Sequence, residues 1–336
     1  MSAHKFNATL AIGPMSSETI EATFRYSNFY RKELMLISSK NQIDWNGGYV
    51  NGWTTKEYMD FVKEMRKRYP QAKVAICRDH CGPGFNGNHD VKDVYKTIDS
   101  DIKEGFDLIH IDFCHFKGTK DEQFAASKKA IERCLKLNPK IRIEVGTDEN
   151  AGINYGLPNI DELEREIDFF TDICDPEFYV VQTGSLVMEI NQVGSFNKPF
   201  VEKVHKMLEE KGLKLKEHNA DYLGKDDIAL RSGIVDAQNI APQLGVIQTS
   251  FVLTKCLVYG VDATDFLDAV YAGGKWKKWM QTNTAENKML CAVIAGHYHF
   301  TSKEYKRLIA ELGKHEDIQE SIIEELSRLI HHYVGE

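Results

Sequence analysis

The sequence predicts an α/β fold, a (β/α)8 TIM barrel followed by a C-terminal helical extension. Short runs of strand-forming residues alternate with segments of helical period, and eight such runs occur before residue 250. No strand signal follows residue 301. Because alternating strands and helices imply parallel pairing, the alternative is an open doubly wound sheet. We expect a barrel domain at residues 1–300 and the helical extension at residues 301–336.

The predicted strands are short runs that favour β-structure. The eighth is the least clear. In chain order they are residues 8–13, 34–38, 73–77, 108–113, 141–146, 178–184, 213–218 and 239–245.

The predicted helices are marked by capping signals and by apolar stripes. Thr54 and Glu57 have the spacing of a capping box, and the same spacing recurs at residues 119 and 122. Apolar residues three and four apart place one face of each helix in the core. These stripes are Ile160, Leu163, Ile167 and Phe170, then Val201, Val204 and Leu208, and finally Ile318, Ile322, Leu326 and Leu329. A further helix start is predicted at residues 231–238, and the last helices are expected to pack on the barrel or on a neighbouring subunit.

Composition and charge disfavour several classes of protein. The formal net charge of -8 disfavours a nucleic-acid partner, because such proteins usually carry a basic surface. No run of about 18 apolar residues occurs, and no basic start precedes an apolar stretch, so we expect a cytoplasmic protein without a membrane partner. The seven cysteines are scattered and include no CxxC pair, which indicates reduced thiols.

Polar residues gather where the predicted strands end. In a TIM barrel all strand carboxyl ends open on one face, and the active site lies there. We therefore expect these side chains to converge. They are Asn41, Gln42 and Asp44 after the second strand, Asp79 and His80 after the third, His110 and Asp112 in the fourth, Glu144 and Asp148 around the end of the fifth, Gln182 and Ser185 at the sixth, and His218, Asn219 and Asp221 at the seventh.

The histidines and carboxylates among these residues predict a metal site. One histidine near a strand end is more often structural, but several imidazoles and carboxylates in one barrel mouth are costly unless a metal or a substrate satisfies them. Histidine and carboxylate ligands with an open position are typical of catalytic zinc. His80, His218 and an acid of the fifth strand can supply three ligands, with His110 as a fourth candidate.

Two later segments admit a structural and a functional interpretation. Residues 273–280, GGKWKKWM, are best interpreted as an amphipathic helix with tryptophans in the core and lysines in water. In the alternative, Lys275 contacts a substrate phosphate near the barrel mouth. The histidines of AGHYHF, His297 and His299, are interpreted as structural.

Six motifs occur in one order along the chain: NQIDWNGGY, DHCGP, IHIDFC, VGTDEN, VVQTG and EHNADY. In their order and spacing, from about residue 8 to about residue 280, the sequence resembles the Z-type subunit family of class II tagatose-bisphosphate aldolase, the larger companion chain of that aldolase. The resemblance implies a TIM barrel related at a distance to zinc-dependent class II aldolases. Members are described either as non-catalytic partners of a smaller aldolase subunit or as metal-dependent ketose-phosphate 4-epimerases.

The resemblance also assigns roles to residues of this sequence. It implies that Asp79 is the catalytic acid/base, that His80 beside it binds the metal, and that His218 is a second ligand. Glu144 or Asp148 is then the carboxylate neighbour of the metal.

The sequence departs from the family pattern around this site. Arg78 stands where the family has glycine, GTD replaces GTE, HNADY replaces a serine-threonine version, and the chain is shorter than typical members. These changes affect the identity of the substrate more than the metal chemistry. The substrate-binding candidates are Asn41, Gln42, Asp44, Arg78, Gln182, Ser185, Asn219 and Lys275.

These observations predict a metal-dependent enzyme of carbohydrate metabolism that acts on a ketose phosphate by retro-aldol and aldol chemistry. A divalent metal, expected to be Zn²⁺, would act as a Lewis acid while the C3–C4 bond breaks. Asp79 would move the C4 hydroxyl proton, with Asp112 or Asp221 as the opposite acid/base.

The fate of the aldehyde fragment separates the predicted activities. Rotation and re-formation of the bond give a 4-epimerase, which we favour, and release gives a class II aldolase, a lyase. The rival from another class is a non-catalytic stabilising subunit of such an aldolase. We expect a homo-oligomer or a complex with a partner aldolase subunit.

Overall fold

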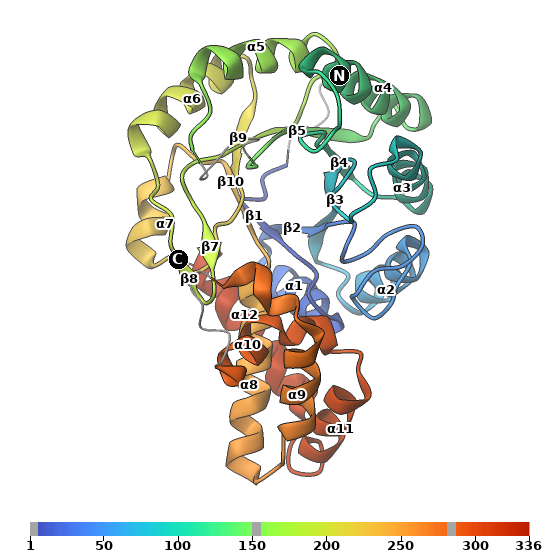
Figure 1. Cartoon of the computed structure of the whole chain (residues 1–336), viewed down its shortest axis with the longest axis vertical. Helices are drawn as coiled ribbons and strands as arrows, with labels where there is room; N and C mark the ends of the chain where they lie inside the picture. Colours follow the sequence, from blue (N-terminus) through green and yellow to red (C-terminus); the bar gives the residue numbers. More distant parts are fainter. Residues whose placement is uncertain (1–5, 150–155, 281–286, 336) are drawn as a thin grey trace.

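The strand-forming runs of the sequence become the strands of a closed parallel barrel (Figure 1). The computed structural model describes residues 6–149, 156–280 and 287–335. Around the barrel the strands lie in the order β1, β10, β9, β6, β5, β4, β3, β2, which confirms the predicted TIM barrel and excludes the open sheet. The strands are β1 (Leu10–Ile12), β2 (Glu33–Ser38), β3 (Lys73–Cys81), β4 (Leu108–Ile111), β5 (Arg142–Thr147), β6 (Phe178–Val181), β9 (Lys214–Glu217) and β10 (Ala237–Ile240). A short antiparallel hairpin, β7 (Val187–Met188) and β8 (Asn191–Gln192), follows β6.

Helices connect the strands and cover the outside of the barrel (Figure 1). Both predicted capping boxes are present, with Thr54 and Thr119 as the N-caps of α2 and α4. The predicted stripes are buried in α5 and α6, except that Ile160 is only partly buried, as amphipathic helices on a barrel require. The helices are α1 (Ser17–Tyr30), α2 (Thr55–Arg68), α3 (Val91–Glu104), α4 (Lys120–Leu137), α5 (Ile160–Thr171), α6 (Lys198–Glu210) and α7 (Lys225–Arg231).

Two apolar cores result from the alternation of side chains along the strands. The larger core lies between the strands and the surrounding helices and continues into the helical part. The smaller one fills the inside of the barrel with residues such as Met35, Cys77, Leu108 and Phe178. Polar side chains continue this inner column toward the carboxyl ends of the strands, and they form the site described below.

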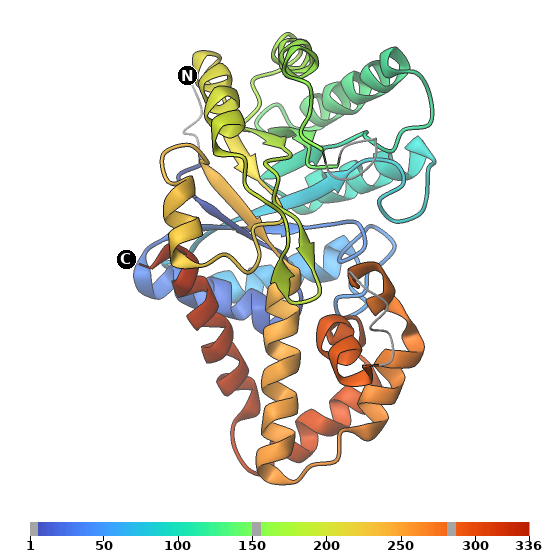
Figure 2. The same cartoon turned by 60° about the vertical axis from the view of Figure 1, so that its left-hand side comes forward.

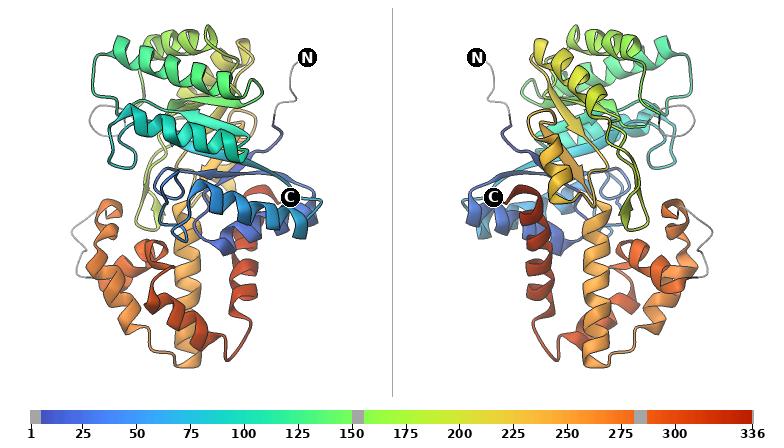
Figure 3. Two further views of the ribbon diagram at one scale, coloured as in Figure 1. Left: turned by 90° about the vertical axis from the view of Figure 1, so that its right-hand side faces the viewer. Right: turned by 90° about the vertical axis from the view of Figure 1, so that its left-hand side faces the viewer.

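Every described element after β10 is helical, and these helices project from one side of the barrel (Figures 2 and 3). The helical part therefore begins earlier than the boundary predicted at residue 300; the assignment of separate domains stays a prediction. Its elements are α8 (Pro242–Tyr259), α9 (Thr264–Gly273), η1 (Lys275–Trp279), α10 (Lys288–Ala295), η2 (Gly296–His299), α11 (Lys303–Leu312) and α12 (Ile318–Val334).

The last helix returns to the barrel. The sequence left two alternatives for it, packing on the barrel or on a neighbouring subunit, and the structure agrees with the first. The predicted stripe of α12 is buried, and the helix packs against α1 and α8. Tyr26 Oη of α1 lies 3.0 Å from His331 Nδ1 of α12, and Arg25 forms an ion pair with Glu320. The C-terminal tail is thus held on the barrel of its own chain.

Three local predictions were wrong. The eighth strand is Ala237–Ile240, because Pro242 lacks an N–H donor and occupies the first turn of α8. Residues 231–238 do not start a helix, since α7 ends at Arg231 and the next described element is that strand. Residues 275–279 form a short 3₁₀ helix in place of the amphipathic α-helix, although Trp276 is buried as expected.

Two features of the described chain agree with its composition. All seven cysteines are free thiols. Among the described residues, none of the helices is both long enough and apolar enough to cross a membrane.

Candidate active site

Strand β3 delivers two consecutive side chains, Asp79 and His80, to the barrel mouth. Along a regular strand, consecutive side chains point alternately into and out of the barrel. A regular strand therefore cannot point both Asp79 and His80 inward. The pairing of β3 with β4 shifts between Arg78 and Cys81, and His80 has the left-handed φ of 42°. A Cβ atom on Gly82 would lie 1.5 Å from the Asp112 carbonyl oxygen, so only glycine fits after this bend. The predicted strand end at Cys77 was too early, since the strand extends to Cys81.

Two further strands end in the same way. Gly146 of β5 and Asn219 after β9 have φ values of 89° and 55°, so each of these chains bends where it reaches the mouth. The bends place Asp148 and His218 beside His80. Asp148 Oδ1 lies 3.5 Å from His80 Nε2 and 3.3 Å from His218 Nδ1.

These three residues have metal-ligand spacing, and His80 and Asp148 are each oriented by a partner. Their potential ligand atoms lie within 4.8 Å of one another. The other nitrogen of His80 lies 2.8 Å from Asp112 Oδ2, and Asn219 Nδ2 donates to Asp148 Oδ2 over 2.6 Å. Such partners fix the orientation of a ligand and keep its second atom free for a metal. We call His80, Asp148 and His218 the outer group.

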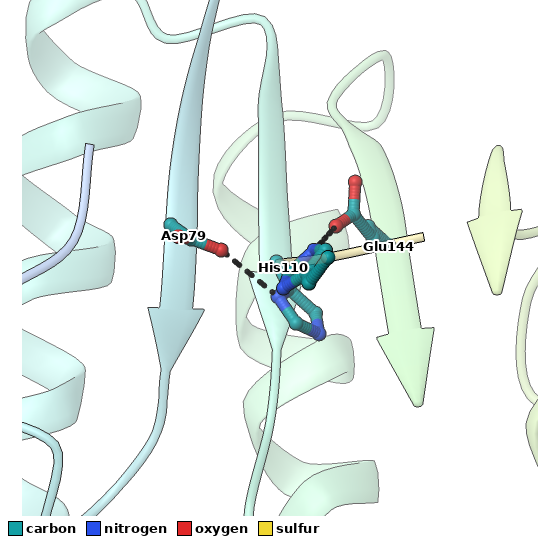
Figure 4. Close-up of side chains that lie close together, drawn as sticks. Asp79, His110 and Glu144 are labelled. Carbon is teal, nitrogen blue, oxygen red and sulfur yellow. Dashed lines mark hydrogen bonds and ion pairs between the residues drawn. The ribbon is translucent and has the colours of Figure 1, made fainter. Parts of the chain in front are cut away.

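A second set of potential ligands lies deeper in the barrel, and we call it the inner group: Asp79, His110, Glu144 and His218. In Figure 4, Asp79, His110 and Glu144 point toward one another from neighbouring strands. His110 Nδ1 lies 3.5 Å from Asp79 Oδ1 and 3.6 Å from Glu144 Oε1. His110 Nε2 is 3.0 Å from the Gly146 carbonyl oxygen, and Nδ1, which lies 3.3 Å from the backbone nitrogen of His80, faces the carboxylates.

The chemistry of these donors fits a divalent cation. Asp148 Oδ1, Glu144 Oε1 and His218 Nε2 are buried without a hydrogen-bond partner, a costly state that a metal would relieve. Two ligand atoms of a tetrahedral zinc ion lie about 3.4 Å apart, close to the separations found in both groups. A metal that acts on substrate needs an accessible position. His80 is partly exposed, whereas His110 and Glu144 are not, so the outer group is the better catalytic position.

The charges of the cluster compensate one another. Burial raises the pKa of Asp79, but His80 and His218 outweigh it and hold that pKa well below its usual range. Burial lowers the pKa of His218, but Asp148 and Asp79 outweigh it and raise the pKa to about 9. Burial also opposes ionisation of Glu144, but Lys216 and His110 lower its pKa to about 2. Charges of opposite sign in the cluster therefore favour each other's ionised forms.

The sequence reasoning missed two residues of the cluster, Lys216 and Asn239. Lys216 lies on β9 with its ammonium group 2.7 Å from Glu144 Oε2, and both side chains are fully buried. Asn239 of β10 donates to Asp79 Oδ2 over 3.4 Å. The alternation of side chains along the strand could have identified Lys216. Lys216 and His218 are two residues apart and therefore share the inward side of β9. Asn239 carried no signal, since the eighth strand was misplaced.

Arg78 is the clearest correction among the predicted substrate contacts. Its side chain is completely buried between the barrel and the helices, where Nε and Nη2 donate to Asp101 over 2.6 and 2.8 Å. Nη1 donates to the carbonyl oxygens of Ser38 and Ile43. As the neighbour of inward-facing Asp79, Arg78 faces outward, so it supports the fold instead of meeting a substrate.

We expect Arg78→Met to lower the free energy of unfolding by about 3–5 kcal/mol, because Asp101 remains as an unpaired buried charge. Urea unfolding followed by circular dichroism measures the change. Replacing both partners, in Arg78→Met with Asp101→Leu, is expected to recover part of the loss. Unchanged stability together with an altered substrate preference would contradict this placement.

Three other predicted residues are tied into networks away from the cluster. Asp44 is buried and pairs with Lys40 at 3.0 Å. Ser185 Oγ donates to Glu217 Oε1 over 2.6 Å. Asp221 Oδ1 accepts the amides of residues 241 and 243 at the start of α8, and burial raises its pKa to about 7. None of the three belongs to a described ligand group.

The remaining predicted substrate contacts have different surroundings. Gln182 Nε2 donates to the backbone oxygen of Asp148 over 2.9 Å, so it supports a ligand. Asn41 Nδ2 donates to the carbonyl oxygen of Phe85, whose ring stacks on His80 at 4.5 Å. Gln42 is buried, with Nε2 3.1 Å from Met15 Sδ, and Lys275 lies in η1 of the helical part.

Fold and site together define a class, the TIM-barrel proteins whose strand ends carry a histidine and carboxylate cluster suited to a metal. Within it, residues 3–149 match the model of the family described as D-tagatose-1,6-bisphosphate aldolase subunit GatZ/KbaZ-like. This match covers less than half of the chain and includes Asp79, His80, His110, Asp112 and Glu144. The family resemblance is thus confirmed over that part, and it supports an aldolase-type enzyme or a subunit of one.

Solved structures show the same fold at low sequence identity. A probable tagatose 6 phosphate kinase from Sinorhizobium meliloti 1021 is 14% identical with a TM-score of 0.78, over 97% of this chain and 99% of that chain. Fructose-bisphosphate aldolase from Campylobacter jejuni is 14% identical with a TM-score of 0.63, over 98% and 90%. The YdjI aldolase from Escherichia coli K12 is 16% identical with a TM-score of 0.52, over 92% and 94%.

Proposed function

We propose that this protein catalyses metal-dependent retro-aldol and aldol chemistry on a ketose phosphate at the mouth of its barrel. The observation that carries the proposal is the outer group, in which His80 and Asp148 are each held by a partner and His218 completes the set of three. A catalytic metal needs such a set together with an open position. When bound, Zn²⁺ would supply Lewis-acid stabilisation of the charge that develops beside the ketose carbonyl.

We assign the substrate proton to Asp79. Without a metal, neighbouring histidines hold its pKa below the usual range, and Asn239 donates to Oδ2. Asp79 can therefore accept the C4 hydroxyl proton while the C3–C4 bond breaks, and return it when the bond re-forms. For release of two fragments, the enediolate left at C3 takes up a proton, either this one from Asp79 or one from water. Phe85 stacks on His80, with the ring centres 4.5 Å apart.

The geometry favours an aldolase over the 4-epimerase that we predicted. An epimerase needs a second acid/base opposite Asp79, and the two candidates are engaged elsewhere. Asp112 is bound to His80 Nδ1 and to the amide of Cys114, while Asp221 caps α8. The 4-epimerase thus remains the second candidate, and zinc and the cytoplasmic location remain predictions.

A panel of ketose mono- and bisphosphates, incubated with the purified and zinc-loaded chain, tests the proposal. Proton and ³¹P NMR distinguish an aldolase, which releases two fragments, from an epimerase, which yields a new ketose phosphate. The family match also allows a stabilising subunit. A chain that binds no metal, turns over no substrate and raises the activity of a partner aldolase on mixing would contradict the enzyme and support that role.

The pH dependence of metal binding follows from His218. Its pKa in the metal-free protein is about 9, above the ordinary value, so the ring is protonated at neutral pH and a metal must displace the proton. We expect the affinity for zinc to rise with pH between 6 and 9, since His80, whose pKa is also raised, must lose its proton as well. Chelator competition between pH 6 and 9 measures the affinity, and calorimetry in buffers of different ionisation enthalpy counts the protons released. An affinity that does not vary with pH would contradict the assignment.

A further inference from the structure

Lys216 is a buried cation without a role in the proposed reaction. It lies on β9, and its ammonium group reaches Glu144 on β5, a strand that is not a neighbour of β9, so the pair crosses the inside of the barrel. The ammonium group also lies 5.3 Å from the centre of the Phe178 ring. A lysine is stable in such a place only when it is paired, because an ammonium ion removed from water loses its hydration.

The ion pair connects Lys216 to a metal ligand. Lys216 occupies Glu144 Oε2, and the other oxygen, Oε1, lies 3.5 Å from His218 Nε2. The opposite nitrogen of the same ring, Nδ1, faces Asp148 of the outer group. Lys216, Glu144 and His218 therefore form a continuous line from the barrel interior to the mouth.

We infer that Lys216 is a positioning residue of the metal site and acts through Glu144. The inference rests on the proposed function. With Oε2 held by Lys216, Glu144 turns Oε1 toward His218 Nε2. The 3.5 Å separation is an ion-pair contact longer than a hydrogen bond, and it favours a proton on Nε2, which leaves Nδ1 for the metal. Carboxylates that orient ligand histidines in this way tune metal affinity. With a neutral side chain at position 216, Glu144 Oε2 loses its partner and the carboxylate can turn away from His218.

The test is the zinc affinity of Lys216→Met, measured by competition with a chromophoric chelator. We expect a loss of about 10- to 100-fold, the usual effect of removing an outer-shell partner. The absorption spectrum of the Co²⁺-loaded protein is expected to change as well, since it reports the ligand geometry. Lys40→Met is the matched control. Lys40 is equally buried and pairs with Asp44 and Asp93 at 3.0 Å outside the barrel, so its loss lowers stability and leaves zinc affinity unchanged.

A second pair of variants separates positioning from a general loss of stability. If Lys216 acts through Glu144, Glu144→Gln and the double variant Glu144→Gln with Lys216→Met bind zinc equally. The double variant removes both buried charges, so it also serves if Lys216→Met does not fold. Wild-type affinity in Lys216→Met, or a further loss in the double variant, overturns the inference and leaves the proposed function standing. A wild-type chain that binds no zinc overturns both.

Discussion

Replacing His218 with alanine is expected to lower the affinity for zinc by more than about 100-fold and to abolish metal-dependent turnover. His218 is the one residue shared by the outer group and the four-residue inner group, and its two nitrogens face Asp148 and Glu144. Losing an outer-shell partner already costs about 10- to 100-fold, so losing a ligand common to both positions costs more. Calorimetric titration and the metal content after dialysis measure the loss.

Two comparisons make this result specific. His315→Ala is the control, because His315 stacks on Tyr259 in the helical part and meets no ligand, so zinc affinity should not change. His80→Ala is expected to lose zinc and His110→Ala to keep most of it, since the accessible outer group holds the catalytic ion. The reverse order would assign the metal to the inner group. Full zinc occupancy in His218→Ala would refute both positions.

The arrangement of strands and helices was predictable because it depends on local patterns. Eight strand runs, capping boxes at Thr54 and Thr119 and the apolar stripes each report one element, and a barrel is the closed arrangement of eight parallel units. The helical part was harder to delimit. α8 is apolar nearly all around, so its pattern was mistaken for a strand at its start, where Pro242 opens the helix.

The residue types of the site were predictable from the sequence. The direction in which each side chain points was not predicted correctly for all of them. Alternation along β3 places Arg78 outside once Asp79 is inside, and along β9 it places Lys216 inside with His218. A charged residue in a strand is usually expected to face solvent, but the Lys216 side chain is buried inside the barrel. The inner face of a barrel can hold an ion pair when both partners belong to it.

His80 marks the limit of such reasoning. Strict alternation would turn it outward after Asp79, and only the shifted pairing and the left-handed φ bring it to the mouth. Neither feature has a local sequence signal, because the shift depends on how β4 and Gly82 pack against the end of β3. Asp221 shows the opposite case. Its position beyond a strand end suggested catalysis, but the nearest donors are the amides of α8.

Asp79→Asn is expected to lower kcat by about 10²- to 10⁴-fold, the contribution of a general acid/base, while zinc binding persists. The amide matches the carboxylate in shape but cannot accept the C4 hydroxyl proton. Zinc persists because His80, Asp148 and His218 supply three ligands without Asp79. Turnover of the substrate found in the ketose panel, together with the zinc content of the same sample, measures both effects.

Turnover and zinc content, measured together, distinguish two roles for Asp79: proton transfer and metal binding. It lies in the inner group, 3.5 Å from His110 Nδ1, so a variant that loses zinc with activity would make it a ligand. Asp107→Asn is the control, since Asp107 accepts the Ile76 amide at the opposite end of the barrel and its loss should leave turnover unchanged. Zinc-loaded Asp79→Asn with wild-type kcat would remove Asp79 from the chemistry. Proton transfer would then require another base, and Glu144, whose Oε1 has no hydrogen-bond partner, lies in the inner group with Asp79.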